Sequence, residues 1–530
     1  MKINQSLQLN PFWLSLLFAF PLACQPPIQE KQGTDFPFSE WEISSFHQAY
    51  NSGSWTVEEV VEAYIKRIEA IDQNGPQLNS MLQLNPKAIE IAKELDSLLK
   101  IGKPKGPLHG IPVVLKDNLD TRDMYTTAGS RALENSLPLK DSDVARKLIA
   151  SGAVILGKAN LSEWANFRGN LSSSGWSGLG GQTKNPYILD RNPCGSSSGS
   201  AVAVSANLSV LGIGTETNGS IVCPSHANGI VGIKPTVGLV SRSGVIPISF
   251  TQDTPGPMAR TVRDAAICLG TLVGVDFADA KTLESAGKYH QDYTQFLNKD
   301  GLKGKRIGWY KAPSGRHFKV DALMEKTIQW MEEEGAVIVP VEQIMDPSTG
   351  GFSFQVMLYE YKEGLNNYFA SLGPDSPIKN LEELIAFNRK DSIELRYHNQ
   401  HYLEMALDKM GLDSEEYQNA LSNMLRQSRE EGVDRVLQEN QLDAIVAPTG
   451  SPAWKTDWVN GDGSHLGSSS PAAQAGYPNI TLPMGMIDGL PVGISIFGTA
   501  WSEPKLLEIA YALEQGRMQR KEPTFQAPKY

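Results

Sequence analysis

Lys116 stands where it could act as the base of a hydrolytic reaction. It directly follows the apolar residues 111–115, and such a run is typical of a buried strand in an α/β sheet. Open α/β sheets keep their sites at the carboxyl ends of their strands. Burial there would favour the uncharged amine over the ammonium ion, whose pKa in water is ~10.4. By itself the pattern also fits a lysine whose amine reaches solvent at a strand end.

A segment rich in glycine and serine offers hydroxyl groups for the same chemistry. Residues 194–200 read Cys-Gly-Ser-Ser-Ser-Gly-Ser and lead at once into the small apolar residues 201–204. The hydroxyls provide several hydrogen-bond donors and acceptors, and the small side chains allow close approach of the backbone. A flexible linker has a similar composition, but a linker is not followed directly by an apolar helix.

Ser220 ends a second polar segment, at the exit of another predicted strand. The apolar stretch that begins at Val210 leads into a tight turn. Backbone N–H groups in such a turn could converge on one point, as an oxyanion hole requires, although an ordinary polar turn has the same composition. The N–H groups concerned are those of Thr217, Asn218, Gly219 and Ser220.

The three segments together resemble the amidase signature family. Its motifs appear in order as Gly-Ile-Pro-x-x-x-Lys-Asp-Asn at 110–118, the Gly/Ser-rich segment, and Gly-Ser-Ile at 219–221. The resemblance spans about residues 38–515. Within the family, the chain is most similar to the bacterial peptide amidases, on residues 163–170, 194–200 and 498–503.

The resemblance implies a catalytic trio and a mechanism. Ser220 would be the nucleophile, Ser196 the bridging serine and Lys116 the base, with an oxyanion hole from the N–H groups of residues 217–220. A hydroxyl is a weak nucleophile that needs an adjacent base, and the amide nitrogen must be protonated before it leaves. One proton relay through the trio could do both, by way of an acyl-enzyme and without a cofactor or metal.

The expected function is that of an amide hydrolase that releases ammonia from a carboxamide, with the C-terminal amide of peptides as the leading substrate. Other small or aromatic carboxamides, a transamidase, and an inactive peptide-binding lipoprotein are the alternatives. Many members of the family have glycine where this chain has Cys194 and Ser198. This departure concerns the range of substrates more than the catalytic trio. Asn166, Ser197 and Trp454 are the predicted substrate-binding residues.

Three other motifs are weaker. Residues 195–199 also spell the G-x-S-x-G of α/β-hydrolases around Ser197, but the preceding residues predict a loop, where that motif needs a strand. Residues 152–159 approach a phosphate-binding loop, yet Ala159 replaces its Ser or Thr and the intervening residues favour a strand. His398 and His401 lack a third metal ligand, so no metal site is predicted.

The elements that must position these residues follow a helix-then-strand pattern. Helix 143–151 precedes strand 153–156, helix 322–334 precedes strand 336–339, and helix 429–440 precedes strand 443–447. This alternation predicts a mainly parallel sheet, and the family resemblance implies a central mixed, twisted sheet. The predicted fold class is therefore α/β, with helices on both faces of the sheet.

Other stretches predict helices and loops around that sheet. Thr56 and Glu59 form a predicted capping box at the start of one helix, and a second helix is expected from Asn85 to about Lys100, with Pro86 in its first position. Residues 352–440 predict a peripheral helical layer, and residues 450–470 predict a long loop near the site. The predicted divisions are a single amidase domain at 38–524 and a tail at 525–530.

Charge and cysteine content exclude some classes of partner. The formal net charge is -11 and no Lys/Arg-rich block is present, which excludes nucleic acid as a partner. The cysteines have neither zinc-site spacing nor the number of a disulfide framework, so Cys194, Cys223 and Cys268 are expected to be buried thiols. The oligomeric state is not predicted.

The N-terminus predicts export. Lys2 precedes the apolar stretch 12–23, which has the length of a signal peptide's apolar core and is too short to span a bilayer. Cys24 follows it directly, so residues 1–24 resemble a lipoprotein signal peptide and residues 25–37 a tether. A periplasmic or membrane-anchored lipoprotein is expected, with attachment through a lipid on Cys24. A plain exported enzyme and an uncleaved N-terminus are the alternatives.

Overall fold

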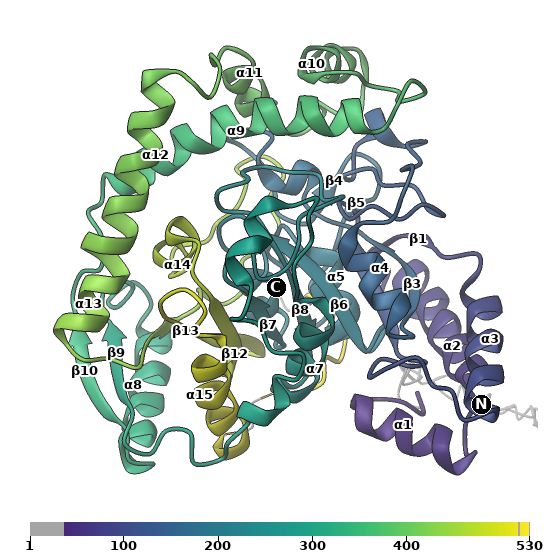
Figure 1. Ribbon diagram of the computed structural model, residues 1–530, viewed down its shortest axis with the longest axis horizontal. Coiled ribbons are helices and arrows are strands. Elements are labelled where there is room, and N and C mark those ends of the chain that lie inside the picture. The colour runs from purple at the N-terminus through teal and green to yellow at the C-terminus, as the bar shows by residue number, and fades with distance from the viewer. Residues whose placement is uncertain (1–35, 518–519, 529–530) are drawn as a thin grey trace, which may run out of the picture. The chain divides into compact units, whose positions relative to one another are not determined.

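An 11-stranded sheet runs through the centre of the computed structural model, which describes residues 36–517 and 520–528 (Figure 1). The predicted signal peptide, Cys24 and most of the tether lie outside the described residues. In spatial order the strands are β1 (Met81–Leu84), β3 (Val154–Ala159), β2 (Pro112–Lys116), β6 (Leu211–Glu216), β8 (Thr254–Ala259), β7 (Val231–Lys234), β12 (Asn479–Ile487), β13 (Leu490–Phe497), β11 (Ala444–Pro448), β9 (Arg306–Tyr310) and β10 (Val337–Val341).

The sheet is mixed, and the expectation of a mainly parallel sheet is wrong for its middle. Strands β3, β2 and β6 are parallel, as are β11, β9 and β10, and these are the parts of the chain where helices separate the strands. The pairs from β6 to β11 are antiparallel. Strands β12 and β13 form a hairpin whose turn, Asp488–Gly489, has positive φ at both residues, so no crossover helix intervenes.

Helices cover both faces of the sheet, which confirms the predicted fold class. Helices α5 (Ser198–Ser205) and α6 (Val222–Ala227) lie on one face, and α7 (Val262–Leu272), α8 (Phe318–Glu333) and α15 (Glu503–Gly516) on the other. Glycines in β6 let α5 approach closely, because a Cβ at Gly212 would lie 3.1 Å from Val204 and one at Gly214 2.7 Å from the Ser197 hydroxyl. The alternate residues Leu211 and Ile213 are fully buried in the opposite core.

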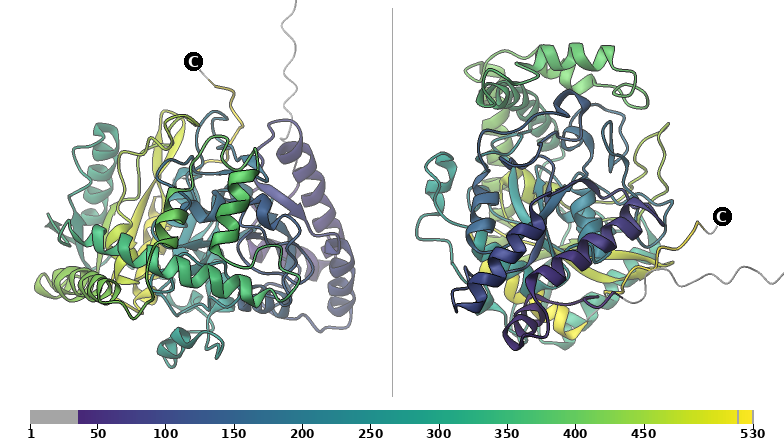
Figure 2. Two further views of the ribbon diagram at one scale, coloured as in Figure 1. Left: turned by 90° about the horizontal axis from the view of Figure 1, so that it is seen from above. Right: turned by 90° about the vertical axis from the view of Figure 1, so that its right-hand side faces the viewer.

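The N-terminal helices lie in front in the right-hand view of Figure 2, and α2 and α3 pack beside β3. They are α1 (Ile43–Ser52), α2 (Val57–Arg67) and α3 (Ala88–Lys100), and α4 (Asp143–Ala150) follows. The predicted Thr56 and Glu59 capping box of α2 is confirmed. Helix α3 begins later than predicted, because the Asn85 side chain binds Ile155 O of β3 at 2.8 Å and accepts the N–H of Lys87 at 2.9 Å, which forms a turn.

The helix-rich stretch forms a layer outside the sheet, in green at the top of Figure 1 and of the right-hand view of Figure 2. Aromatic and aliphatic side chains on α9 and α10 form a second buried core with Trp164 and Phe167. The helices are α9 (Thr349–Ser371), α10 (Leu381–Lys390), α11 (His401–Leu407), α12 (Glu415–Ser428) and α13 (Asp434–Glu439). Within the described ranges, no helix is both long and apolar enough to cross a bilayer.

The expectation of three buried thiols is wrong for two of the cysteines. Cys194 and Cys223 form a disulfide with Cα atoms 5.9 Å apart, and only Cys268 is a free, buried thiol in the described chain. The two partners are 29 residues apart in sequence, and no local spacing signals their pairing. They meet because the loop before α5 packs against the first turn of α6.

Candidate active site

Lys116 and Ser196 lie in direct contact at the carboxyl end of β2. The Lys116 Nζ is 2.7 Å from Ser196 Oγ, and both side chains are fully buried. The same amine lies 2.8 Å from Thr215 Oγ1 and donates to Thr215 O at 3.1 Å. Thr215 Oγ1 also accepts a hydrogen bond from Asn118 Nδ2 at 3.0 Å, so the neighbouring strand β6 fixes the position of the amine.

The environment of Lys116 favours its uncharged form. Burial lowers its pKa from 10.5 to about 7, and the charges of Asp253 and Glu216 act in the opposite direction. Its hydrogen-bond partners, Ser196 and Thr215, are uncharged. A large fraction of this amine is therefore able to accept a proton near neutral pH.

The backbone of Ser196 is held by the segment that follows β3. Ser162 N donates to Ser196 O at 3.0 Å, and Gly199 N donates to Asn160 O at 2.8 Å. A Cβ at Gly195 would lie 2.2 Å from Ser162 Oγ, so only glycine fits at this close approach. The peptide bond between Gly195 and Ser196 is cis.

Ser220 lies in the turn between β6 and α6 and, unlike Ser196, is partly exposed. Its carbonyl accepts the N–H of Ser197 at 3.1 Å, which joins the two serine segments. The Glu216 carboxylate accepts the N–H groups of Ile221 at 2.8 Å and Val222 at 3.0 Å and so holds the chain just after the serine. The structure thus brings Ser196 and Lys116 into contact and sets Ser220 beside the loop that carries Ser196.

The backbone N–H groups of residues 217–220 share one property. Within the described residues, none of them donates a hydrogen bond to a protein atom. Gly219 has a φ of 85°, which allows the turn, and the side chain of Asn218 bonds Ser469 at 2.7 Å and Ser470 at 3.2 Å. Thr217 Oγ1 donates to Asp253 Oδ1 at 2.5 Å, so the first two residues of the turn are anchored.

The long loop between β11 and α14 (Ser470–Ala475) lies against this turn, as predicted, through Ser469 at its end, next to Ser470 of α14. Trp454, in the same loop, is partly exposed, and its indole donates to Asp462 Oδ1 at 3.2 Å. Asp462 in turn accepts the Ser174 hydroxyl at 2.6 Å, which ties the loop to a second segment near Ser196.

The other two predicted substrate-binding residues have different surroundings. Asn166 is partly exposed, has a φ of 77°, and accepts the Ser172 hydroxyl at 2.9 Å. Ser197 is fully buried, and its hydroxyl donates to Thr215 O at 3.1 Å and accepts Thr215 N at 3.2 Å. Ser197 therefore fastens the serine loop to β6.

Thr215, Glu216 and Asp253 are site residues that the sequence reasoning missed. Asp253 Oδ2 accepts the N–H groups of Ile248 and Ser249, at 2.8 and 2.9 Å, and burial raises its pKa to about 6. Polar residues at the end of an otherwise apolar strand, as in Thr215 and Glu216, were the available signal. Asp253 carries no comparable signal, because its loop is remote in sequence from the motifs.

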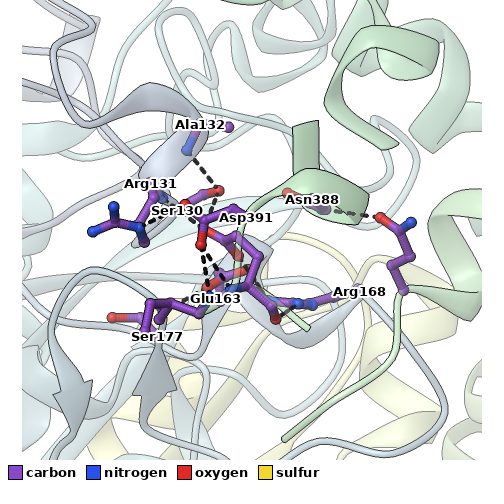
Figure 3. Close-up of polar contacts among 12 residues, drawn as sticks. Ser130, Arg131, Ala132, Glu163, Arg168, Ser177, Asn388 and Asp391 are labelled. Atoms are coloured by element: carbon purple, nitrogen blue, oxygen red, sulfur yellow. Dashed lines mark hydrogen bonds and ion pairs between the residues drawn. The ribbon is translucent and has the colours of Figure 1, made fainter. Parts of the chain in front are cut away.

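A buried ion cluster supports the site from the side of the helical layer (Figure 3). Arg168 contacts Glu163 and lies 3.1 Å from Glu394 Oε2, and all three side chains are at most 2% exposed. Glu394 Oε1 also accepts Arg131 N at 2.7 Å, and Glu163 Oε2 accepts Gly178 N at 2.6 Å. Burial, helped by the charge of Glu394 and opposed by Arg168, raises the pKa of Glu163 well above its usual range.

This ion cluster adjoins two of the three catalytic candidates, Ser196 and Lys116, through the backbone. Glu163 follows Ser162, whose N–H binds Ser196 O. Trp164 N donates to Ala128 O at 3.0 Å, and Ala128 N donates to Asp117 O at 2.9 Å, next to Lys116. The cluster therefore joins the peripheral helices to the supports of both residues.

His398, His401 and the segment that resembles a phosphate-binding loop belong to other parts of the structure. His398 packs edge-on against Trp176 with ring centroids 5.0 Å apart, and His401 begins α11. Across the described ranges, no group of three or more His, Cys, Asp or Glu side chains is placed to hold a metal ion. Residues 154–159 form strand β3, as predicted.

Comparison with known proteins gives consistent results. A family model described as Amidase matches residues 59–507. A probable amidase of Arabidopsis thaliana is 40% identical over 512 residues, which cover 94% of each chain.

Two solved structures are similar over nearly the whole chain. The native peptide amidase from Stenotrophomonas maltophilia has 48% identity and a TM-score of 0.89, covering 92% of this chain and 99% of its own. A structure of the peptide amidase PAM in complex with the competitive inhibitor chymostatin has 48% identity and a TM-score of 0.90, covering 92% of this chain and 100% of its own.

Proposed function

Because this chain belongs to the amidase family and is an amide hydrolase, we propose that it cleaves the C-terminal carboxamide of peptides through an acyl-enzyme on Ser220. The observation that carries the proposal is the 2.7 Å contact between Lys116 Nζ and Ser196 Oγ, at an amine whose pKa is lowered to about 7. A base of this pKa is suited to general acid–base work at neutral pH.

The reaction begins with transfer of two protons. Neutral Lys116 takes the proton of Ser196 as Ser196 takes the proton of Ser220, whose oxygen attacks the amide carbon. When the tetrahedral intermediate collapses, the proton returns through Ser196 to the nitrogen and ammonia leaves. Water then attacks the acyl ester, gives its proton to the same relay, and releases the carboxylic acid and free Ser220.

The turn at residues 217–220 is proposed to bind the oxyanion. Its N–H groups have no acceptor in the described protein, and the helix α6 that follows adds little because it is short. Each such donor contributes about 10²–10³-fold to the rate when it is aimed at the developing negative charge. The anchors at Thr217 and Asn218 keep these donors in place before the substrate arrives.

The choice of a peptide substrate rests on the similarity to peptide amidases and on the position of the long loop. Trp454 and Asn166 are partly exposed on segments next to the serine loops, and we assign them contacts with the peptide. Ser197 acts on the substrate only indirectly, because Thr215 occupies its hydroxyl.

The function is tested by incubating the purified protein with N-blocked peptide amides and measuring ammonia and the free acid. A panel should include peptides with a free C-terminus, side-chain amides and small aromatic carboxamides. Peptide amides should be converted fastest, Ser220→Ala should lose activity, and added hydroxylamine should trap the acyl group as a hydroxamate. Preference for another carboxamide would reassign the substrate, and no turnover on the whole panel would contradict the proposal.

Export is a separate proposal. The disulfide between Cys194 and Cys223 supports it, because disulfides persist mainly in oxidising compartments. Fractionation of cells that make the full chain should place the protein outside the cytoplasm. Cys24→Ala should release it from the membrane fraction if Cys24 carries a lipid, and unchanged partitioning would contradict lipid attachment.

A further inference from the structure

We infer that the Cys194–Cys223 disulfide positions the two catalytic serines relative to each other, an inference that rests on the proposed function. Cys194 lies just before Ser196, and Cys223 lies just after Ser220. The covalent bond therefore links the loop that carries Ser196 to the helix α6 that directly follows Ser220. The mechanism requires the two hydroxyls to exchange a proton, so their separation must be held closely.

The backbone at Cys194 indicates that the side chain itself is used. Cys194 has a φ of 58°, in the left-handed region that favours glycine. Its N–H binds Asn192 Oδ1 at 2.8 Å and its carbonyl accepts the Ser198 hydroxyl at 2.6 Å, so the residue is rigidly joined to the loop around Ser196. A glycine would adopt this conformation at lower cost, but it could not form the link.

Cys223 is joined as directly to the nucleophile turn. It lies in the first turn of α6, and its N–H donates to Gly219 O at 2.8 Å. A shift of Cys223 therefore moves the carbonyl of the residue before Ser220.

The non-covalent links between the two segments are the packing of Ala201 and Val204 of α5 against Ile221 and a small set of hydrogen bonds. Ser197 N donates to Ser220 O at 3.1 Å, and Asn228 Nδ2 donates to Pro193 O at 2.8 Å. Hydrogen bonds tolerate changes in length and angle, whereas the disulfide holds its Cα atoms at 5.9 Å. Proton transfer needs heavy atoms within about 2.6–3.2 Å, so small displacements reduce the rate of the chemical step more than they reduce substrate binding.

The disulfide is less deeply buried than the free thiol. Cys194 is 5% exposed and Cys223 is partly exposed, in contrast to the fully buried thiol of Cys268. Dithiothreitol delivers two electrons and two protons, which converts the disulfide to two thiols while the reagent closes to its own cyclic disulfide. Treatment with dithiothreitol therefore tests the bond without a substitution, and circular dichroism checks that the reduced enzyme stays folded.

The experiment compares the wild type, the double variant Cys194→Ala/Cys223→Ala and the control Cys268→Ala, each with and without dithiothreitol. Turnover of a peptide amide is measured below the unfolding temperature of every sample, and thiols are titrated to verify reduction. We expect reduction of the wild type to lower kcat about 10-fold or more, with KM changed less than about 3-fold. The double variant should have the kcat of the reduced wild type, and dithiothreitol should not change it further. Cys268→Ala should behave as the wild type.

Two further measurements separate positioning from mere stabilisation. Reduction should slow the modification of Ser220 by phenylmethanesulfonyl fluoride, located by mass spectrometry, while circular dichroism stays native. A reduced, folded enzyme with full kcat and only a lower Tm would overturn the inference. Turnover that survives Ser220→Ala would instead overturn the proposed function, whatever the effect of reduction.

Discussion

The hydroxyl of Thr215 lies 2.8 Å from the amine of Lys116, on the strand next to that of the lysine. Thr215 thereby orients the proposed base, and its own position is fixed by Asn118 and Ser197. Thr215→Val should lower kcat about 10-fold with little change in KM, because the amine loses an acceptor but keeps its burial. Thr215→Ser retains the hydroxyl and should stay near wild type in steady-state assays. Equal kcat for the two variants would contradict a positioning role.

Activity should rise with pH through about 7. The pKa of Lys116 is lowered to about 7, and only the amine that has lost its proton can act as the base, so the acid limb of kcat/KM should follow that group. Ionised Asp253 raises the pKa of Lys116, so Asp253→Asn should move this limb to lower pH. The full pH–rate profiles of both proteins check this, and a shift of the limb to higher pH would contradict the assignment.

Gly219→Ala should impair catalysis as well as stability. Gly219 has a φ of 85°, and a Cβ there would lie 3.1 Å from Ser469 Oγ, in the proposed oxyanion turn. Gly53 at the end of α1 is a matched control, since its φ is 70° and nothing lies within 4 Å of a Cβ there. Each substitution should destabilise by roughly 1 kcal/mol in urea unfolding, but only Gly219→Ala should lower kcat. Equal kcat values for the two variants would show that the turn at residues 217–220 takes no part in catalysis.

The buried ion cluster should respond unequally to substitution of its members. Arg168→Met would leave Glu163 and Glu394 buried without their cation and should destabilise by about 3–5 kcal/mol. Glu163→Gln should cost much less, because burial raises the pKa of Glu163 and so disfavours its charged form, and Gln can still accept Gly178 N. Denaturant unfolding measures the free energy of unfolding of both variants. A similar loss of stability in the two would show that Glu163 is ionised.

Chelators should leave turnover unchanged. The proposed relay uses one amine, two hydroxyls and backbone N–H groups, and none of its steps needs a metal. Dialysis against EDTA followed by the ammonia assay checks this expectation. Loss of turnover that returns when a divalent metal is added back would contradict the mechanism.

The sequence predicted the family well because its motifs, which also carry the catalytic candidates, are short and contiguous. The family match confirms the resemblance drawn from residues 110–118, 194–200 and 219–221. The amphipathic helices were also predictable, since their periodicity and the capping box at Thr56 are local. The antiparallel middle of the sheet was not, because the order of strands depends on contacts between distant segments.

The supports of the site were predictable only in part. Thr215 and Glu216 stand out as polar residues at the end of a buried strand, but their partners come from other loops. The Cys194–Cys223 pair and the Arg168 cluster depend entirely on tertiary contacts, so the spacing of these residues carries no signal. Burial likewise decides the protonation of Lys116, and a sequence shows only that burial is expected.

The central claim is that an uncharged Lys116 drives proton transfer through Ser196 to Ser220. The most direct measurement is kcat of Lys116→Met on a peptide amide, with native folding verified by circular dichroism, because Met fills a similar volume without a basic group. The account predicts a fall of about 10³-fold or more. A kcat within a few-fold of wild type would contradict it.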